Sequence, residues 1–165
     1  MRVLIVFLLF NLIYSTSNFE EVRNQFPVID SLEETEKYLG FLKNEQDETS
    51  QAYFAAMLLM KSKYVKFPLT KLKYFKKGKL LLDDLAFNHQ NNIEIRYIRF
   101  LLQSEMPNFL GYNNNLVEDY LIIIEDIYSY NLSNKFKLRM LNNMLVSKNI
   151  SDQKAQKIKQ LLNNL

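Results

Sequence analysis

The 165-residue sequence contains no cysteine, one histidine, and only three glycines and three prolines. Without cysteine the chain cannot form a disulfide, use a thiolate nucleophile or build a cysteine-based zinc site. The single histidine, His89, excludes a multi-histidine metal centre within one chain. Residues that break helices are scarce while Leu, Ile, Lys, Glu and Asn are frequent, so we expect an all-α fold rather than a β-sandwich or barrel.

The net charge is only +3, from 21 basic and 18 acidic residues. This imbalance is too slight to indicate a nucleic-acid or membrane partner by itself. The sequence also lacks a nucleophile elbow, a phosphate-binding loop and metal-ligand spacing. It therefore implies no cofactor and no catalytic residue, and we expect a non-catalytic protein.

The N-terminus has the pattern of a secretory signal peptide. Arg2 precedes the apolar run Val3–Phe10, and the small residues Ser15, Thr16 and Ser17 supply a cleavage site after Ser17. The run is shorter than the ~20 residues that a membrane-spanning helix needs, so an uncleaved membrane anchor is the weaker alternative. We therefore expect residues 1–17 to be a signal peptide, and residues 18–165 to form a single α-helical domain that is exported to the periplasm or secreted.

Apolar residues recur at helical spacing along the rest of the chain, and Ser, Thr and Asp residues supply N-caps. The residues Leu121 to Ile124 could pass for a buried strand, but their surroundings favour a helix. Gly78 costs roughly 1 kcal/mol in a helix relative to alanine, so it predicts a close crossing with the preceding helix. A buried stripe on that helix is predicted for Leu72, Phe75, Leu82, Leu85 and Ala86. The predicted helices cover residues 18–25, 31–43, 51–65, 70–86, 93–104, 116–128, 134–146 and 152–162.

The succession of paired helices raises the question of internal repeats. Residues 52–92 resemble a degenerate tetratricopeptide-type unit, with Ala52 and Ala56 in a first helix and Gly78 in a second. The closing turn lacks proline, and a regular 34-residue period is absent. We therefore expect antiparallel helical hairpins in a degenerate tetratricopeptide-like array.

Three segments carry a further resemblance: Lys71–Lys79 (KLKYFKKGK), Asn92–Arg99 (NIEIRYIR) and Pro107–Tyr112 (PNFLGY). In these the chain resembles an uncharacterised family of small exported bacterial α-helical proteins with tetratricopeptide-like helical hairpins. The resemblance weakens after about Tyr128. It implies the fold and export, and it supplies no activity, cofactor or catalytic residue.

Two arginines, Arg96 and Arg99, lie three residues apart and therefore on one side of a helix that is otherwise apolar. At least one of them is expected to be partly buried and to need an anionic partner. The favoured interpretation is a structural clamp, in which arginine binds either the backbone carbonyls of the PNFLGY segment or a carboxylate. Glu105 and Asp119 are the candidate carboxylate partners. The alternative is an anion-binding groove that serves a small anionic-ligand binder or an enzyme. The adjacent acidic pairs Asp83–Asp84 and Glu118–Asp119 are interpreted as helix-surface charges.

The PNFLGY loop, Pro107–Tyr112, follows this helix. Pro107 cannot continue a helix, and Gly111 can supply a positive φ. The apolar side chains either plug the end of the core or form an exposed contact patch, and plugging is the favoured interpretation. The candidate residues for a binding site or structural clamp are Arg96, Arg99, Glu105, Asn108 and Tyr112.

A lysine cluster is interleaved with aromatic residues between positions 61 and 79. The signal segment argues against nucleic acid, and the favoured interpretation is a solvated helical face with lysine stems lying over the core. The alternative is peripheral binding to an anionic membrane surface or a polyanionic glycan. The cluster consists of Lys61, Lys63, Lys66, Lys71, Lys73, Lys76, Lys77 and Lys79.

The main functional hypothesis for the whole chain is a protein- or peptide-interaction module.

Overall fold

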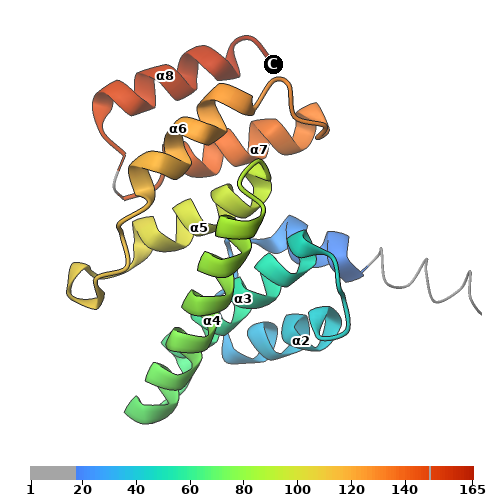
Figure 1. Cartoon of the computed structure of the whole chain (residues 1–165), viewed down its shortest axis with the longest axis vertical. Coiled ribbons are helices and arrows are strands. Elements are labelled where there is room, and N and C mark those ends of the chain that lie inside the picture. Colours follow the sequence, from blue (N-terminus) through green and yellow to red (C-terminus); the bar gives the residue numbers. More distant parts are fainter. Residues whose placement is uncertain (1–17, 149) are drawn as a thin grey trace, which may run out of the picture. The chain divides into compact units, whose positions relative to one another are not determined.

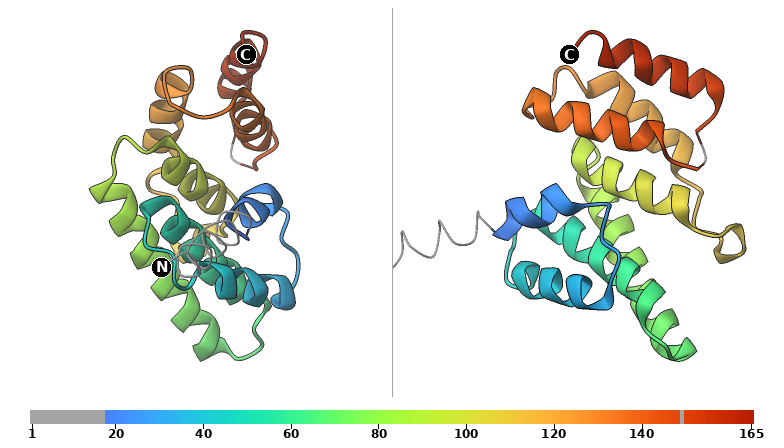
Figure 2. Two further views of the ribbon diagram at one scale, coloured as in Figure 1. Left: turned by 90° about the vertical axis from the view of Figure 1, so that its right-hand side faces the viewer. Right: turned by 180° about the vertical axis from the view of Figure 1, so that it is seen from behind.

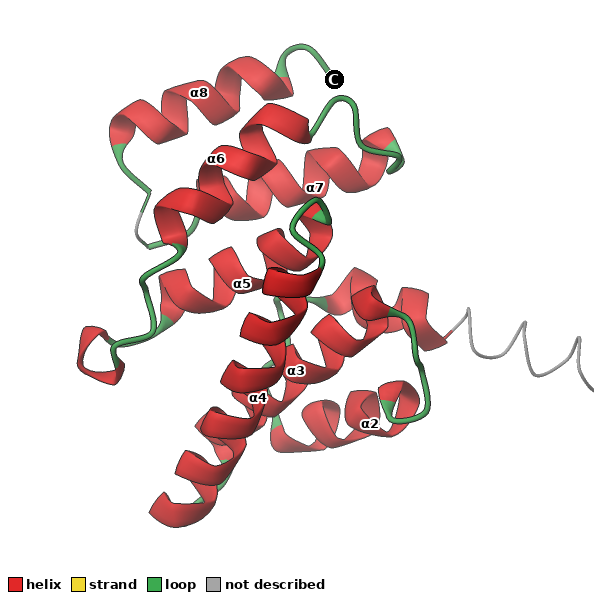
Figure 3. Cartoon of the chain, in the orientation of Figure 1, coloured by secondary structure: helices red, strands yellow, loops and turns green. Residues whose placement is uncertain are grey.

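The computed structural model describes residues 18–148 and 150–165. All regular structure in these ranges is helical, without a strand, which confirms the predicted all-α class (Figure 3). No helix among the described residues is long and apolar enough to cross a membrane. The predicted signal peptide lies outside them. After a helical segment over residues 18–25, the elements are α2 (Leu32–Leu42), α3 (Glu48–Tyr64), α4 (Pro68–Asn88), α5 (Ile93–Glu105), the 3-10 helix η1 (Asn108–Leu110), α6 (Leu116–Asp126), α7 (Asn134–Leu145) and α8 (Asp152–Leu162).

Serine caps begin three of the helices where the sequence predicts them. The hydroxyls of Ser31, Ser133 and Ser151 accept hydrogen bonds from backbone N–H groups three residues further on, at 3.1, 3.3 and 3.4 Å. Each bond satisfies a donor that the first turn of a helix leaves unpaired. The run from Leu121 to Ile124 lies inside α6, so the helical interpretation of this segment is confirmed.

Two helices begin earlier than predicted. The cap of α3 is Asp47, whose carboxylate accepts from Ser50 N at 2.8 Å, so Thr49 and Ser50 already lie in the first turn. The helix α4 begins at Pro68 rather than at Thr70. Proline favours the first helical position because its fixed φ suits a helix and its missing N–H has no partner to lose there.

The chain divides into two compact units, the first extending to Leu81 and the second running from Leu82 to Leu165. The boundary between them falls within residues 18–165, which are predicted to form one domain. The division lies inside α4. The tetratricopeptide-like arrangement of hairpins stays a prediction.

In the first unit, α2 lies alongside α3 (Figures 1 and 2). The segment before α2 is fastened to α3 by aromatic contacts. The rings of Phe19 and Phe26 meet the ring of Tyr53 edge-on, with centroids 5.7 and 5.5 Å away. The Tyr64 hydroxyl donates to the carbonyl of Ile29 at 3.0 Å. Tyr53 is fully buried, so the two ring contacts join the segment before α2 to the core of the first unit.

The helices α3 and α4 approach each other closely at Gly78. A Cβ atom built on Gly78 would lie 2.8 Å from the carbonyl oxygen of Ala55 and 2.9 Å from the backbone nitrogen of Leu59. The close crossing that Gly78 predicts is therefore confirmed. Leu82 and Ala86 are buried as predicted, whereas Leu72 is 45% exposed, so its place in the buried stripe is wrong.

In the second unit, α5 packs against α6 and α7, and α7 lies beside α8 (Figures 1 and 2). The Tyr97 hydroxyl accepts from the Asn143 side-chain amide at 2.7 Å, which joins α5 to α7. The hydroxyls of Tyr120 and Tyr128 donate to the carbonyls of Lys154 and Leu161 at 3.1 and 2.8 Å. Tyrosine hydroxyls thus provide polar links between helices whose main contacts are apolar.

Candidate functional site

The helix α5 is buried on every side from Ile93 to Ser104. It packs against α6 and α7, and its buried residues include charged and polar side chains among the apolar ones. Its cap is Asn92, whose side-chain oxygen accepts from Glu94 N and Ile95 N at 3.1 and 3.2 Å. The charged residues of such a helix must find their partners inside the protein.

Arg99 makes a two-point contact with Asp119 in the first turn of α6. Its Nε donates to Oδ2 and its Nη2 donates to Oδ1, both at 2.7 Å. Asp119 is fully buried. Paired parallel bonds of this kind between a guanidinium and a carboxylate are short and geometrically specific. The prediction that Asp119 pairs with the arginines is confirmed.

Arg96 reaches the same carboxylate from one turn earlier. Its Nη1 donates to Asp119 Oδ1 at 3.1 Å and to Glu118 Oε1 at 2.8 Å, and its Nε donates to the carbonyl of Gln90 at 3.3 Å. The side chain of Arg96 is 4% exposed and that of Arg99 is 6% exposed. We call the two arginines, Asp119 and Glu118 the arginine clamp.

The electrostatics of the clamp follow from these contacts. Burial lowers the pKa of the Arg99 guanidinium, but the hydrogen bonds and charge of Asp119 outweigh it and leave that pKa raised. Burial raises the pKa of the Glu118 carboxyl, but the hydrogen bonds from Asn115 and Arg96 and the Arg96 charge leave it lowered. Burial raises the pKa of the Asp119 carboxyl, and the two guanidinium groups oppose that shift.

The charge count of the clamp argues against an anion site. Asp83 Oδ1 lies 3.8 Å from Arg99 Nη1, so three carboxylates surround the two guanidinium groups. A bound anion would meet a surplus of negative charge and would have to displace existing partners. The arrangement therefore fits the structural clamp, which joins α5 to α6.

The interpretation of the acidic pairs near the clamp as helix-surface charges is wrong for Asp119, which is fully buried. The other three residues lie at the surface: Asp84 is exposed, and the side chains of Glu118 and Asp83 are 52% and 30% exposed. Asp83 also accepts from the Tyr112 hydroxyl at 3.0 Å. A helical spacing cannot reveal this difference, because it depends on which helix packs opposite.

Glu105 lies outside the clamp. Its carboxylate pairs with Lys148 at 2.6 Å, and the side chains are 51% and 71% exposed. The prediction that Glu105 is a partner of the arginines is therefore wrong. An exposed pair of this kind contributes roughly 0–1 kcal/mol of stability.

The PNFLGY loop is held at both ends. On one side, Gln103 of α5 donates to Asn115 Oδ1 at 3.2 Å and accepts from Asn115 N at 3.1 Å. On the other, Tyr112 is 3% exposed and bonds to Asp83. Gly111 adopts φ 59°, as its place in the loop predicts, and its N–H donates to the Asn108 carbonyl at 3.0 Å.

The apolar residues of the PNFLGY loop have different environments. Tyr112 plugs the core as predicted, whereas Phe109 is 86% exposed and Leu110 is 37% exposed. The prediction that Phe109 plugs the core is therefore wrong. The alternative interpretation, an exposed contact patch, fits its position better. Asn108 lies exposed at the start of η1 and contributes its carbonyl to the turn. Of the candidate residues, the structure brings Arg96, Arg99 and Tyr112 into one network and leaves Glu105 and Asn108 outside it.

We expect stability to fall at high pH partly through Tyr112. Burial and the Asp83 carboxylate raise the pKa of its hydroxyl far above the ordinary value. The raised pKa contributes stability that is present below the unfolded-state pKa of about 10 and is lost as pH rises above it. Tyr112→Phe should reduce this loss by about 1.4 kcal/mol per pH unit above pH ~10. Urea unfolding of both proteins at several pH values measures this loss. If the free energy of unfolding depended on pH equally in the variant and in the unmodified chain, the prediction would be contradicted.

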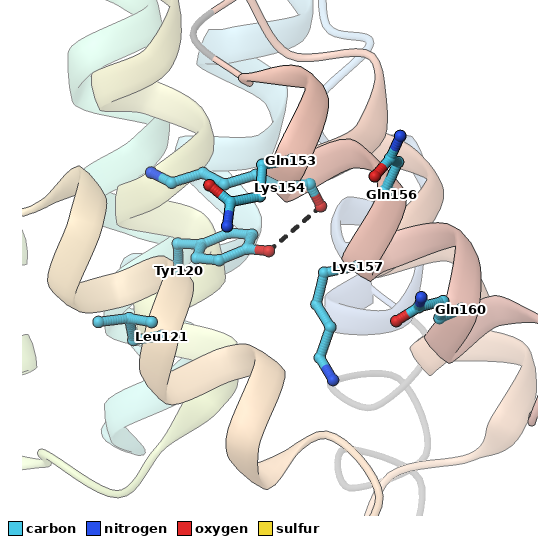
Figure 4. A pocket seen from close by; sticks show the side chains of 7 residues that line it. All are labelled: Tyr120, Leu121, Gln153, Lys154, Gln156, Lys157 and Gln160. Atoms are coloured by element: carbon cyan, nitrogen blue, oxygen red, sulfur yellow. Dashed lines mark hydrogen bonds between the residues drawn. The ribbon is translucent and has the colours of Figure 1, made fainter.

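A shallow groove of about 440 Å³ lies between α6 and α8 (Figure 4). The Lys154 ammonium lies 4.8 Å from the centroid of the Tyr120 ring. The lining has no carboxylate and no histidine, so it offers no acid–base pair. Nowhere among the described residues do three His, Asp or Glu side chains converge as a metal site requires. The groove is lined by Tyr120, Leu121, Gln153, Lys154, Gln156, Lys157 and Gln160.

Comparison with known proteins found no matching family model, no matching curated protein and no matching solved structure. The resemblance to small exported bacterial helical proteins therefore stays a prediction. Sequence reasoning missed the bond of Glu118 to Arg96, the approach of Asp83 to Arg99 and the capping of α5 by Asn92. Asn92 carried a usable signal, since asparagine directly before an apolar helical run favours the N-cap position.

Proposed function

We propose that this chain is an exported, non-catalytic helical protein that binds a protein or peptide partner through the PNFLGY loop. One observation carries the proposal: Phe109 is 86% exposed on a loop whose C-terminal residue, Tyr112, is buried and whose flanks are joined by the Gln103–Asn115 bonds. Gln103 is fully buried and Tyr112 nearly so. A loop that is positioned by a rigid scaffold is a common location for binding residues.

The energetics support a partner for Phe109. Full burial of a phenylalanine side chain releases about 1.5–3 kcal/mol relative to exposure, so the present arrangement leaves this stabilisation unused. Large aromatic side chains often carry much of the energy of an interface by filling a pocket of the partner. A loop that is already fixed loses less conformational entropy on binding than a free one. The bonds of Tyr112 and Gln103 therefore favour recognition as well as folding.

The alternative of a small anionic-ligand binder or enzyme finds less support. Arg96 and Arg99, which would carry it, are already bonded to Asp119 and Glu118. The proposal includes export because residues 1–17 have the pattern of a signal peptide. It predicts that protein recovered from outside the cytoplasm begins at Asn18, which N-terminal sequencing would establish.

We expect Phe109→Asp to abolish partner capture without lowering stability. The charged side chain would remain solvated in the free protein, but it would place an unpaired charge in the partner's pocket. The full chain, immobilised at its C-terminus, is exposed to an extract of the cells that produce it, and captured proteins are quantified by mass spectrometry. A partner should be recovered at least about 10-fold less by the variant, which corresponds to the loss of about 1.4 kcal/mol.

The matched control is Val146→Asp, since Val146 is 81% exposed in the same unit and lies outside the loop. This variant should capture the same partner as the unmodified chain. A set of captured proteins that is identical for all three chains would refute the proposal, provided that thermal unfolding shows all three to be equally folded.

A further inference from the structure

The charges of this chain are strongly segregated along the sequence. Residues 49–82 contain the eight lysines of the lysine cluster and none of the 18 acidic residues. The rest of the chain has 13 basic and 18 acidic residues, so its charge is opposite in sign. The small net charge of the whole chain therefore conceals a concentrated positive segment.

Much of this positive charge is exposed on the N-terminal half of α4. Lys66, Lys73 and Lys76 are exposed, and no ion pair between described residues involves them. Lys61 differs, since it pairs with Glu36 at 2.9 Å and its side chain is 13% exposed. The cluster therefore divides into Lys61, which serves the fold, the half-buried Lys79, and six exposed lysines: Lys63, Lys66, Lys71, Lys73, Lys76 and Lys77.

Apolar side chains share this exposed surface. Leu69 is 83% exposed, Leu72 is 45% exposed and Leu80 is 65% exposed. At about 100° of rotation per residue, these three leucines fall within about 80° of arc on α4. Gly78, against α3, lies on the opposite side of the helix. Phe67, which is 75% exposed, precedes the first turn.

We call Lys66, Phe67, Leu69, Leu72, Lys73, Lys76 and Leu80 the lysine–leucine face. By the same geometry, Lys73 and Lys77 flank the leucines on one side and Lys79 on the other. The apolar stem of a lysine can lie along an apolar surface while its ammonium group contacts water or negatively charged groups. This arrangement is typical of helices that lie at a lipid interface, where apolar side chains enter the headgroup region and lysines meet anionic lipids.

We propose that the lysine–leucine face binds the surface of a membrane that contains anionic lipids. The exposed lysines Lys66, Lys73, Lys76 and Lys77 supply charge complementarity to phospholipid headgroups. The exposed leucines and Phe67 supply the inserting groups. A convex helical face with separated leucines suits a lipid surface, because lipids rearrange around it without a preformed pocket. The proposal is independent of the PNFLGY loop, which belongs to the other unit.

The test is sedimentation of the full chain with vesicles of phosphatidylcholine alone or of phosphatidylcholine with phosphatidylglycerol. Residues 1–17 are unchanged in every variant, so their apolar run contributes equally and cancels in the comparison. We expect much stronger binding to the anionic vesicles, and weaker binding at higher salt because the Debye length falls to about 3 Å at 1 M.

The decisive variant is Lys66→Glu/Lys73→Glu/Lys76→Glu. Each lysine near an anionic surface contributes about 1 kcal/mol, so we expect the partition coefficient on anionic vesicles to fall by at least about 100-fold. All three side chains are exposed and solvated, so folding should persist. Circular dichroism checks this.

The matched control reverses the same amount of charge elsewhere, with Lys135→Glu/Lys157→Glu/Lys159→Glu, all exposed positions in the second unit. Its binding should fall much less. A separate variant, Leu69→Ser/Leu80→Ser, should weaken binding while leaving the charge unchanged. Equal binding to both vesicle types, or an equal loss in both charge-reversed variants, would overturn the proposal. The proposal would also be overturned if the chain did not bind vesicles but bound polyglutamate tightly. That result would indicate an acidic protein partner.

Discussion

Asp119→Ala is expected to lower the free energy of unfolding by about 3–5 kcal/mol, the typical penalty for removing one partner of a buried ion pair. The carboxylate is fully buried and accepts three hydrogen bonds from Arg96 and Arg99, at 2.7 to 3.1 Å. Its loss would leave the buried Arg99 guanidinium without its main partner. Chemical denaturation followed by circular dichroism measures the change.

The adjacent residue provides the control. Glu118 also bonds to Arg96, but its side chain is 52% exposed, so water can replace it. Glu118→Ala should therefore lower the free energy of unfolding by at most about 1 kcal/mol. Equal effects of the two alanine variants would mean that Asp119 is no more important than a surface carboxylate, and the clamp would be the wrong description.

A third variant separates the loss of a partner from the presence of charge. Arg96→Met/Arg99→Met/Asp119→Leu removes the buried charges together and keeps similar volumes. Replacing a buried ion pair by apolar residues is often neutral or stabilising by 1–4 kcal/mol, whereas leaving one charge alone is costly. We expect the triple variant to be more stable than Asp119→Ala. If it also retains partner capture through Phe109, the arginines serve the fold rather than binding.

The features that could be predicted from the sequence are those set by local chemistry. Ser31, Ser133 and Ser151 begin helices because a short hydroxyl side chain satisfies the N–H groups of the first turn. Gly111 ends η1 with a positive φ because glycine has no Cβ atom to oppose the left-handed conformation. Each of these depends on a few neighbouring residues, so the sequence contains enough information.

The candidate site was predicted only in part, because its contacts join distant residues. The need of Arg96 and Arg99 for an internal partner follows from their apolar helix. The choice of Asp119 over Glu105 does not, since it depends on how α6 packs against α5. The exposure of Phe109 has the same origin: composition favours burial of a phenylalanine, and only the position of the loop decides otherwise.

The second large effect is expected at Gly78. Gly78→Ala should lower the free energy of unfolding by about 2 kcal/mol, although alanine is the better helix former by about 1 kcal/mol. The reason is that the new Cβ would lie 2.8 Å from the Ala55 carbonyl oxygen and 2.9 Å from the Leu59 backbone nitrogen. Both atoms belong to the backbone of α3, so relief requires that two helices separate rather than that a side chain rotates.

Gly40 in α2 is a matched control, because nothing lies within 4 Å of a Cβ atom built there and its φ is not positive. Gly40→Ala should therefore raise the free energy of unfolding by about 0.5–1 kcal/mol through helix propensity alone. The same chemical change should thus have opposite signs at two helical glycines, with a difference of about 3 kcal/mol. Stabilisation by Gly78→Ala would show that α3 and α4 do not cross closely at this residue, and the lysine–leucine face would then lose the packing that fixes which side of α4 is exposed.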